Sequence, residues 1–456
     1  MSGSLNPLGG RMQDDSSYMY DCISTYISWC EKDINNDRKL SQTTGRNNKH
    51  MINFAPTKPI EQLNAQSEIK IEEIRTFSKE SSRQTVMFTK SSYNIFHPTD
   101  FLLTVAPNIS RDLISSQNFN EIQNLAKHLK EGVTSFFGFE FHLASSKARS
   151  DYLIAVSSQK KEREALLNAL DNLPENLSQQ KEWQQVRRLT EQWVNPNSIL
   201  HNNILGLWLE FDTSNEDIGI PVPNIFLQTI PLRIDTPEDV EKCIWVTRVA
   251  LPVLTGSKVP EQLENKFIDA LKKLPKGASV FHVASMLARG AEGMRLIIKR
   301  IKPEDIVPYL KSIGWEDSQD NGLTVLLNDV KKFSNCIRLH INIGDYIDPK
   351  IGLECFISPD RYHEGEGWNE FFNYLVSKNM CLPHLSSALL AFPGVIQEDQ
   401  TEEFSLDSYM PSVKIEGNNF SKALVRYISH VKLSYEPGRP LEAKAYTGVR
   451  LFGKRQ

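Results

Sequence analysis

The sequence has little cysteine and no long apolar run. Its six cysteines are scattered without CxxC spacing, which argues against a zinc site and predicts buried, unreactive thiols. No apolar run approaches the roughly 20 residues that a membrane-spanning helix needs. The first residues, MSGSLNPLGGRMQDD, contain no apolar stretch of the kind found in signal peptides. These absences predict a cytoplasmic protein that does not contact a membrane.

An excess of charge of either sign is also lacking. The chain has 52 lysines and arginines against 56 aspartates and glutamates, and its formal net charge is −4. Such a balance predicts no binding of nucleic acid, so any affinity for anions must come from a local cluster of basic side chains. The chain has no GxxxxGKS/T, no GxGxxG after a strand and no GxSxG. The sequence therefore does not support a P-loop, Rossmann or hydrolase-type enzyme.

The composition changes along the chain. Residues 1–85 are polar and are predicted to form an N-terminal extension, partly disordered or helical. Within this extension, YMYDCISTYISWCEKD has the spacing of one amphipathic helix. Residues 86–456 are predicted to form a single domain.

From about residue 117 the sequence alternates between helical and strand patterns. Apolar residues spaced by 3.6 positions predict a helix over 118–132, and two strands follow at 136–143 and 151–156. The same order of helix, strand, strand and helix recurs five times. Strand pairs are predicted at 136–156, 204–230, 279–301, 336–357 and 430–449, and the last helices at 368–379, 384–392 and 420–428.

Ten strands in hairpins separated by helices can form an open α+β sheet or can close into a barrel. Closure removes both exposed edges of a long antiparallel sheet. An open amphipathic sheet, with helices on one face and water on the other, remains the alternative. We favour an α+β fold in which a ten-stranded antiparallel barrel of five αββα units is surrounded by helices.

Alternate strand residues form two sets with different chemistry. In 136–143, Phe137, Phe139 and Phe141 share one face, while Glu140 and His142 share the other. The second face collects glycine, tryptophan, histidine, asparagine and basic residues, with few threonines, and its glycines leave room for close approach. This composition predicts a polar barrel interior. The side chains assigned to it include Glu140, His142, Trp208, Glu210, Arg295, Lys299, Arg338, His340, Lys432, Ser434, Lys444 and Tyr446.

Five αββα units with a polar strand face resemble the aromatic prenyltransferases of the PT-barrel (ABBA) superfamily. The resemblance covers about residues 117–452 and lies in the architecture, without a diagnostic motif. It implies that the barrel interior is the active site and that lysines and arginines on several strands hold a prenyl diphosphate. It also implies tyrosines around the allylic cation and a glutamate on an early strand that binds an aromatic acceptor. Only Tyr446 is clearly inward among the tyrosines, which departs from the family pattern.

Carried onto this sequence, the resemblance implies two groups of site residues. The catalytic group is Glu140, with Glu210 as the second choice, and His142 as a proton carrier. The substrate-binding group is Arg295, Lys299, Arg338, Lys432, Lys444, Tyr446, Trp208 and His340. A structural ion pair between Arg338 and Glu354 is the simpler interpretation of those two residues.

The predicted function is transfer of a prenyl group from an allylic prenyl diphosphate to an aromatic small molecule or peptide side chain in secondary metabolism. Two alternatives stay open: a tailoring protein for natural products or ribosomal peptides that uses the same barrel without a prenyl donor, and a non-catalytic binding or scaffold protein. No DDxxD-type cluster is present, so no metal site and no required cofactor are expected, although Mg²⁺ can accompany the diphosphate. The expected oligomeric state is a monomer or weak homodimer.

Overall fold

The computed structural model describes residues 97–213, 220–290, 293–316, 321–334, 336–357, 366–397 and 420–455. The predicted N-terminal extension, 1–85, and the helix expected within it lie outside the described residues. No helix among the residues described here is long and apolar enough to cross a membrane.

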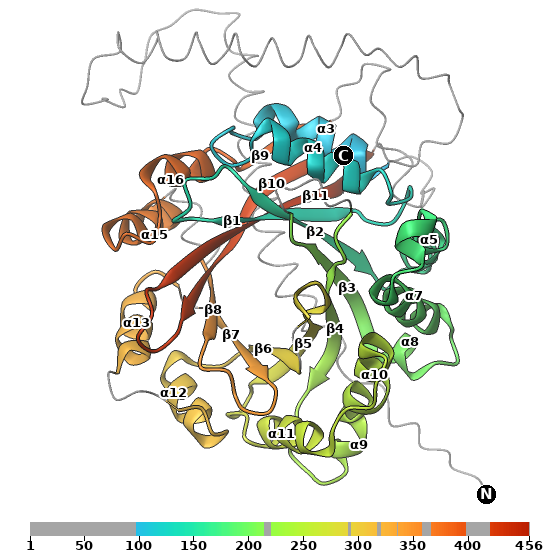
Figure 1. Ribbon diagram of the computed structural model, residues 1–456. Coiled ribbons are helices and arrows are strands. Elements are labelled where there is room, and N and C mark those ends of the chain that lie inside the picture. Colours follow the sequence, from blue (N-terminus) through green and yellow to red (C-terminus); the bar gives the residue numbers. More distant parts are fainter. Residues whose placement is uncertain are drawn as a thin grey trace, which may run out of the picture. The chain divides into compact units, whose positions relative to one another are not determined.

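Ten antiparallel strands form a closed ring, shown along its axis in Figure 1. Each strand pairs with the next one in the chain from β1 to β8, β8 pairs with β10, and β10 with β11. The ring closes because β11 also pairs with β1. The ten strands are β1 Phe136–His142, β2 Ser150–Ser157, β3 Ile204–Phe211, β4 Asn224–Leu232, β5 Ser279–Ser285, β6 Met294–Lys299, β7 Cys336–Ile343, β8 Ile351–Phe356, β10 Phe420–Tyr435 and β11 Glu442–Arg455.

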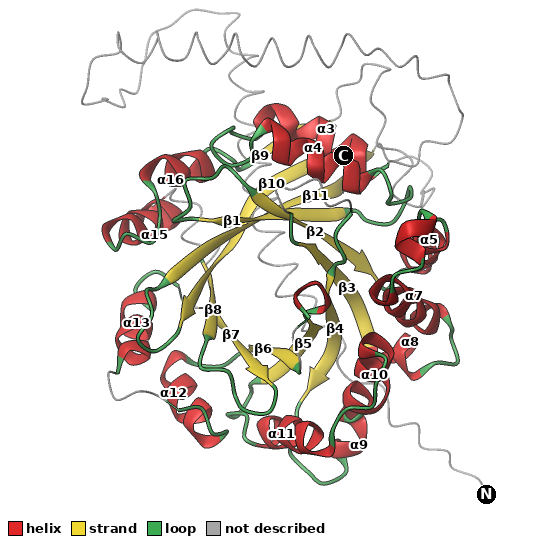
Figure 2. Ribbon diagram, viewed as in Figure 1, coloured by secondary structure: helices red, strands yellow, loops and turns green. Residues whose placement is uncertain are grey.

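Helices surround the ring on its outside (Figure 2). Their order confirms the repeated unit of helix, two strands and helix. The helices are α3 Pro98–Val105, α4 Ser116–Ala126, α5 Lys160–Asp171, α6 Glu175–Ser178, α7 Lys181–Val194, α8 Ile199–Asn203, α9 Asp239–Cys243, α10 Leu251–Thr255, α11 Glu261–Lys272, α12 Pro303–Ser312, α13 Gly322–Val330, α15 Glu366–Ser377 and α16 Pro383–Leu390. Short turns η1 Ala106–Asn108, η2 Val246–Ala250 and η3 Leu287–Arg289 complete the set.

The main core lies between the outer face of the barrel and the helices. Phe137, Phe139 and Phe141 of β1 are each at most 2% exposed and form part of this core. Phe137 contacts Phe101 of α3, with ring centroids 6.3 Å apart. The apolar set of each strand therefore covers the outside of the barrel, and the polar set faces inward, as the alternation predicted.

One predicted helix is wrong. Residues 420–428, expected to be helical, form the first half of β10. This half pairs with β11 and also with β9, the short strand Gly394–Gln397, whereas the second half pairs with β8. A short apolar run cannot be assigned by its period alone, and here pairing with strands on both sides decides in favour of a strand.

Four of the described strands contain irregularities that alternation cannot reveal. The pairing register shifts at Val280/His282, and also at Ile204/Gly206, Gln228/Leu232 and Ile428/His430. At the shift Val280/His282 of β5, the consecutive rings of Phe281 and His282 lie 4.2 Å apart. Phe281 contacts the inward Arg338 at 4.7 Å, so the irregularity brings an additional aromatic ring to the inner face.

Candidate functional site

Glu140 lies at the centre of the polar network on the inner face of β1. It is 1% exposed, and its carboxylate accepts hydrogen bonds from the ammonium of Lys444 and the hydroxyl of Tyr446, both on the neighbouring strand β11. Burial alone would raise the pKa of Glu140, but the charges of Lys444 and Lys432 hold it well below its ordinary value. Glu140 is therefore an ionised, buried carboxylate.

A second buried carboxylate, Glu354 of β8, gathers basic groups from two neighbouring strands. Its oxygen Oε1 lies 2.7 Å from Nε2 of His340 and 3.5 Å from Nε2 of His430, and its Oε2 lies 3.6 Å from Arg338. The predicted pair of Arg338 and Glu354 is thus present. Arg338 also lies between two rings, 4.7 Å from Phe281 and 4.2 Å from Phe356. Burial would raise the pKa of Glu354, but these basic groups keep it well below its ordinary value.

The two networks meet through an aromatic stack. The ring of His430 on β10 lies parallel to the ring of Tyr446 on β11, with centroids 4.4 Å apart. His430 is near Glu354, and Tyr446 donates to Glu140. The two carboxylate networks are therefore continuous across the four neighbouring strands β8, β10, β11 and β1.

Lys432 of β10 differs from Lys444, whose ammonium group contacts Glu140. Among the described residues, no hydrogen-bond or ion-pair partner contacts the ammonium group of Lys432. Burial, together with the positive charge of Arg295, lowers the pKa of Lys432 to about 7. Arg295 itself donates from Nε to Oδ1 of Asn342 at 2.8 Å. The two basic groups therefore influence each other electrostatically inside the barrel.

Glu210 of β3 forms a separate ion pair near Glu140. Arg289 of the η3 turn donates to Glu210 at 2.8 Å and to both oxygens of Asp212 at 2.7 and 2.8 Å. Burial, with the nearby negative charge of Glu140, raises the pKa of Glu210 to about 7. Arg289 could not be assigned to the site from the sequence, because a turn residue between two strands has no predictable partner across the barrel.

The inner face also carries an apolar cluster separate from the main core. Its residues lie on β4, β5 and β6 and on the turn that follows β5, and Trp208 of β3 packs against them. Trp208 meets the edge of Phe136 with centroids 4.8 Å apart, and Lys299 lies 5.6 Å from the ring of Phe281. The cluster consists of Phe226, Phe281, Ala284, Met286 and Ile297. None of these five had been assigned to the site.

Every residue assigned to the interior from the sequence lies on one of the ring strands or next to one, but the residues divide into distinct groups. Glu140, Lys444 and Tyr446 lie together. Arg338 and His340 share Glu354, and Glu210 lies with the unpredicted Arg289. His142 differs from the rest, because its side chain is 53% exposed.

Three potential metal ligands lie close together at this exposed end of β1 and β2. The ligand atoms of Glu140, His142 and Asp151 are all within 4.8 Å of one another. Nε2 of His142 is 3.8 Å from Glu140 and 3.9 Å from Asp151. The ammonium of Lys444 already contacts the carboxylate of Glu140, so a metal ion at this point would compete with that ammonium group.

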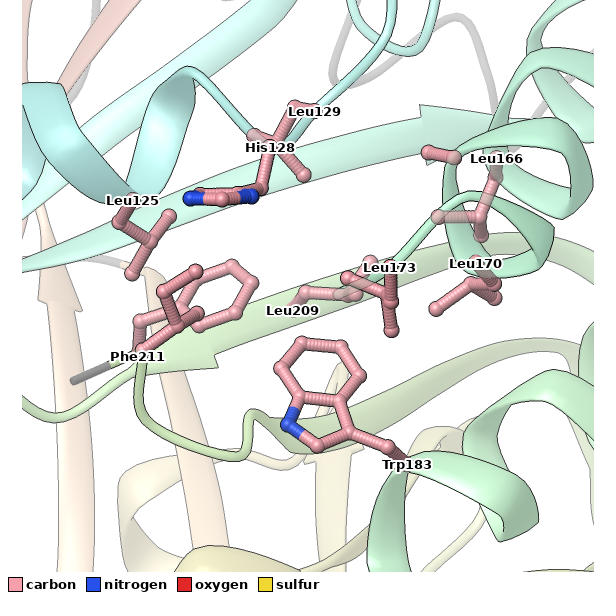
Figure 3. A pocket seen from close by; sticks show the side chains of 11 residues that line it. Leu125, His128, Leu129, Leu166, Leu170, Leu173, Trp183, Leu209 and Phe211 are labelled. Atoms are coloured by element: carbon pink, nitrogen blue, oxygen red, sulfur yellow. The ribbon is translucent and has the colours of Figure 1, made fainter. Parts of the chain in front are cut away.

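A small pocket lies outside the barrel wall, among α4, α5, α7 and the outer face of β3 (Figure 3). Its volume is about 20 Å³, and leucines together with Trp183 and Phe211 form most of its lining. Nε1 of Trp183 is buried there without a hydrogen-bond partner. A cavity of this size holds about one water molecule, so it is too small for a substrate.

Replacing Arg289 with glutamine is expected to change how stability depends on pH. A carboxyl whose pKa is higher in the folded state than in the unfolded chain makes stability fall as pH rises through that interval. Without Arg289 the pKa of Glu210 should rise further above about 7, because burial is then less opposed. Between about pH 7 and pH 9 the variant should lose about 1 kcal/mol more than the wild type in urea unfolding. Arg187→Gln, which breaks an exposed pair with Asp171, should follow the wild-type curve, and parallel curves for Arg289→Gln would contradict the assignment.

Comparison with known proteins gives likenesses of structure only. No family model and no curated protein matches the sequence. Among solved structures, the prenyltransferase PriB in its apo form is 14% identical over 76% of this chain and 94% of its own, with a TM-score of 0.45. The 5-dimethylallyltryptophan synthase from Streptomyces coelicolor is 13% identical over 77% and 95%, with a TM-score of 0.43. AnaPT from Neosartorya fischeri is 11% identical over 78% and 92%, with a TM-score of 0.41.

The chain has the PT-barrel (ABBA) architecture expected from its sequence. The strand order of this chain, the pairing of β11 with β1 and the surrounding helices define this architecture. A fold does not define a reaction, so the chemistry must be argued from the inner face.

Proposed function

We propose that this protein is an aromatic prenyltransferase that binds an allylic prenyl diphosphate and an aromatic acceptor inside its barrel. The observation that carries the proposal is the position of Lys432 inside the barrel. Its ammonium group has no partner among the described residues, and the charge of Arg295 acts on it. An apolar cluster lies on the adjoining strands β4 to β6. A prenyl diphosphate combines these two chemistries, since it has a multiply charged head and an apolar tail.

The basic residues suit a leaving group that gains negative charge. Ionisation of an allylic C–O bond requires fixed positive charges around the diphosphate before the bond breaks. Arg295, Lys432 and the ring-stacked Arg338 come from β6, β10 and β7, and a closed barrel holds these strands rigidly. Arg338 remains tied to Glu354, so Lys432 and Arg295 are the principal diphosphate ligands in this proposal. Lys299, which lies 5.6 Å from the ring of Phe281, is an additional one.

The acceptor would lie near Glu140 and Glu210. The carboxylate of Glu140 is already shared by Lys444 and Tyr446, yet a carboxylate has about four lone-pair sites and can accept an acceptor N–H or O–H as well. Glu210, with its pKa near 7, is suited to take the proton that the aromatic ring loses after alkylation. Trp208 and Tyr446 supply electron-rich faces for the allylic cation.

No resident metal is needed for this proposal. Basic side chains supply the positive charge, and Mg²⁺ can enter as a counter-ion of the donor. The first alternative, a tailoring protein without a prenyl donor, would leave Lys432 and the internal apolar cluster without a use. The second alternative, a scaffold protein, would favour basic residues on an open surface rather than on the inner face of a closed ring.

Replacing Lys432 with alanine is expected to weaken donor binding about tenfold to a hundredfold, the range of a lost charge-assisted hydrogen bond. The measurement is calorimetric titration with dimethylallyl thiolodiphosphate, an unreactive analogue of the donor. Lys160→Ala is the matched control, since the side chain of Lys160 is 84% exposed on the outside of the barrel. If the folded wild-type protein does not bind the analogue, the prenyltransferase proposal is wrong.

A further inference from the structure

The two nitrogens of the His340 imidazole have different surroundings. Nε2 lies 2.7 Å from Oε1 of Glu354, while Nδ1 is buried and has no hydrogen-bond partner among the described residues. The residue is 5% exposed. Because an ionised carboxylate only accepts, Nε2 carries the proton and Nδ1 presents a bare lone pair. A buried acceptor of this kind lacks a donor in the described structure.

The side chains of His340 and Lys432 pack close to each other over Gly352. Gly352 of β8 is paired with His340 across the sheet. A Cβ at Gly352 would lie 2.9 Å from Cε of Lys432 and 3.0 Å from Cβ of His340. The stem of Lys432 and the base of His340 therefore both pass closely over a glycine, and any larger residue would push them apart. His340, with its unpartnered Nδ1, therefore lies in the same part of the inner face as Lys432, whose ammonium group has no partner among the described residues.

Charged groups from three other strands act on His340, namely Lys432 of β10, Arg295 of β6 and Glu354 of β8, and His282 of β5 also interacts with it electrostatically. Arg338 lies with His340 on β7, and both share Glu354 with His430 of β10. Burial, followed by the charge of Lys432, lowers the pKa of His340 to about 3 despite the hydrogen bond to Glu354. Without a ligand, His340 is neutral, with a lone pair among positive charges.

A polyanion at Lys432 and Arg295 would reverse this environment. Phosphate oxygens and the lone pair of Nδ1 would repel each other, unless a proton lies between them. We propose that the anion held by Lys432 and Arg295 binds together with a proton on Nδ1 of His340, which then donates to the anion while Nε2 stays on Glu354. The identity of that anion as a donor diphosphate rests on the proposed function. His340 is then a binding residue that contacts the donor only as an imidazolium.

Proton uptake makes donor affinity depend on pH in a defined way. For each proton taken up, the association constant falls tenfold for each unit by which the pH rises. Lys432 contributes a second proton, because burial and Arg295 lower its pKa to about 7 in the free protein and a bound polyanion would raise it. Phosphate esters lose their last proton near pH 6, so at about pH 8 the ligand itself does not titrate. At that pH the wild type should take up about two protons.

The experiment is titration with dimethylallyl thiolodiphosphate at about pH 8 in buffers of different ionisation enthalpy. The slope of the measured heat against that enthalpy gives the number of protons taken up. Lys432→Arg keeps the charge and removes the titration, so one proton should remain. His340→Asn keeps an N–H donor near the position of Nδ1 without titrating, and one proton should remain there too. The double variant should bind with no uptake.

The two proposals can fail separately. Absence of binding by the folded wild type overturns the proposed function and this inference with it. Binding by His340→Asn with the same uptake as the wild type overturns the inference alone. If His340→Asn does not fold, Lys432→Arg still decides the question, because zero uptake by that variant would leave His340 without a proton.

Discussion

Replacing Lys444 with alanine is expected to lower the free energy of unfolding by about 3–5 kcal/mol, the cost of leaving a buried charge without its partner. The remaining carboxylate, Glu140, is 1% exposed and would retain the hydroxyl of Tyr446 and the more distant charge of Lys432. Urea unfolding at about pH 7 measures the loss. Replacing both partners, as Glu140→Gln with Lys444→Ala, should restore a large part of it, because no charge is then buried alone.

The loss should also shrink as the pH falls. In the wild type the pKa of Glu140 is held below its unfolded value, so its contribution to stability is complete above about pH 4.5 and lost in more acidic solution. Without Lys444, burial is less opposed and the pKa of Glu140 rises. The variant can then neutralise the carboxyl by protonation, and at about pH 5 it should lie closer to the wild type than at pH 7. A constant difference across this range would contradict the ionised state assigned to Glu140.

A side chain at Gly138 is expected to disturb the seam where the barrel closes. Gly138 of β1 is paired with Gly448 of β11, and a Cβ at Gly138 would overlap the carbonyl oxygen of Thr447. Backbone cannot move aside as a flexible side chain can, so strands β1 and β11 would have to separate. We expect Gly138→Val to lower the free energy of unfolding by about 3 kcal/mol, at the upper end of the usual cost of overpacking.

The measurement is the urea midpoint followed by tryptophan fluorescence. Gly438→Asn is the matched control, because a Cβ at Gly438 meets nothing within 4 Å and asparagine tolerates its φ of 72°. The control should change stability by about 0.5 kcal/mol or less. If Gly138→Val unfolds at the wild-type midpoint, β1 and β11 are not paired as described.

Much of the fold could be predicted because alternation is a local signal. The apolar residues of β1 alternate with the polar residues that include Glu140, and a strand necessarily turns the two sets to opposite faces. Closure was an inference from the number of hairpins, since no single residue encodes it. The helix predicted at 420–428 failed for the complementary reason. Its strand character depends on β9 and β11, and pairing partners are not visible in a short run of residues.

The strand face of the candidate site residues could be predicted from the sequence, but their contacts with one another could not. Strand alternation placed Lys432 and Lys444 on the same face, but it could not show that Lys444 contacts Glu140 while Lys432 has no partner within the described part of the chain. Arg289 was not predicted because it lies on a turn. Phe281 was not predicted because it lies at a register shift within β5. Both positions depend on backbone geometry that has no fixed spacing in sequence.

The seam between β1 and β11 has a consequence for how the protein is made. The contact between Glu140 and Lys444 joins residues separated by 304 positions. A ribosome therefore releases β1 to β8 well before the strand that completes the ring has been synthesised. Until then β1 exposes an unpaired edge, and the inward charges of Glu140 and its neighbours face water. Such distant pairing predicts slow folding and a need for protection during synthesis, because an open strand edge can pair with another chain.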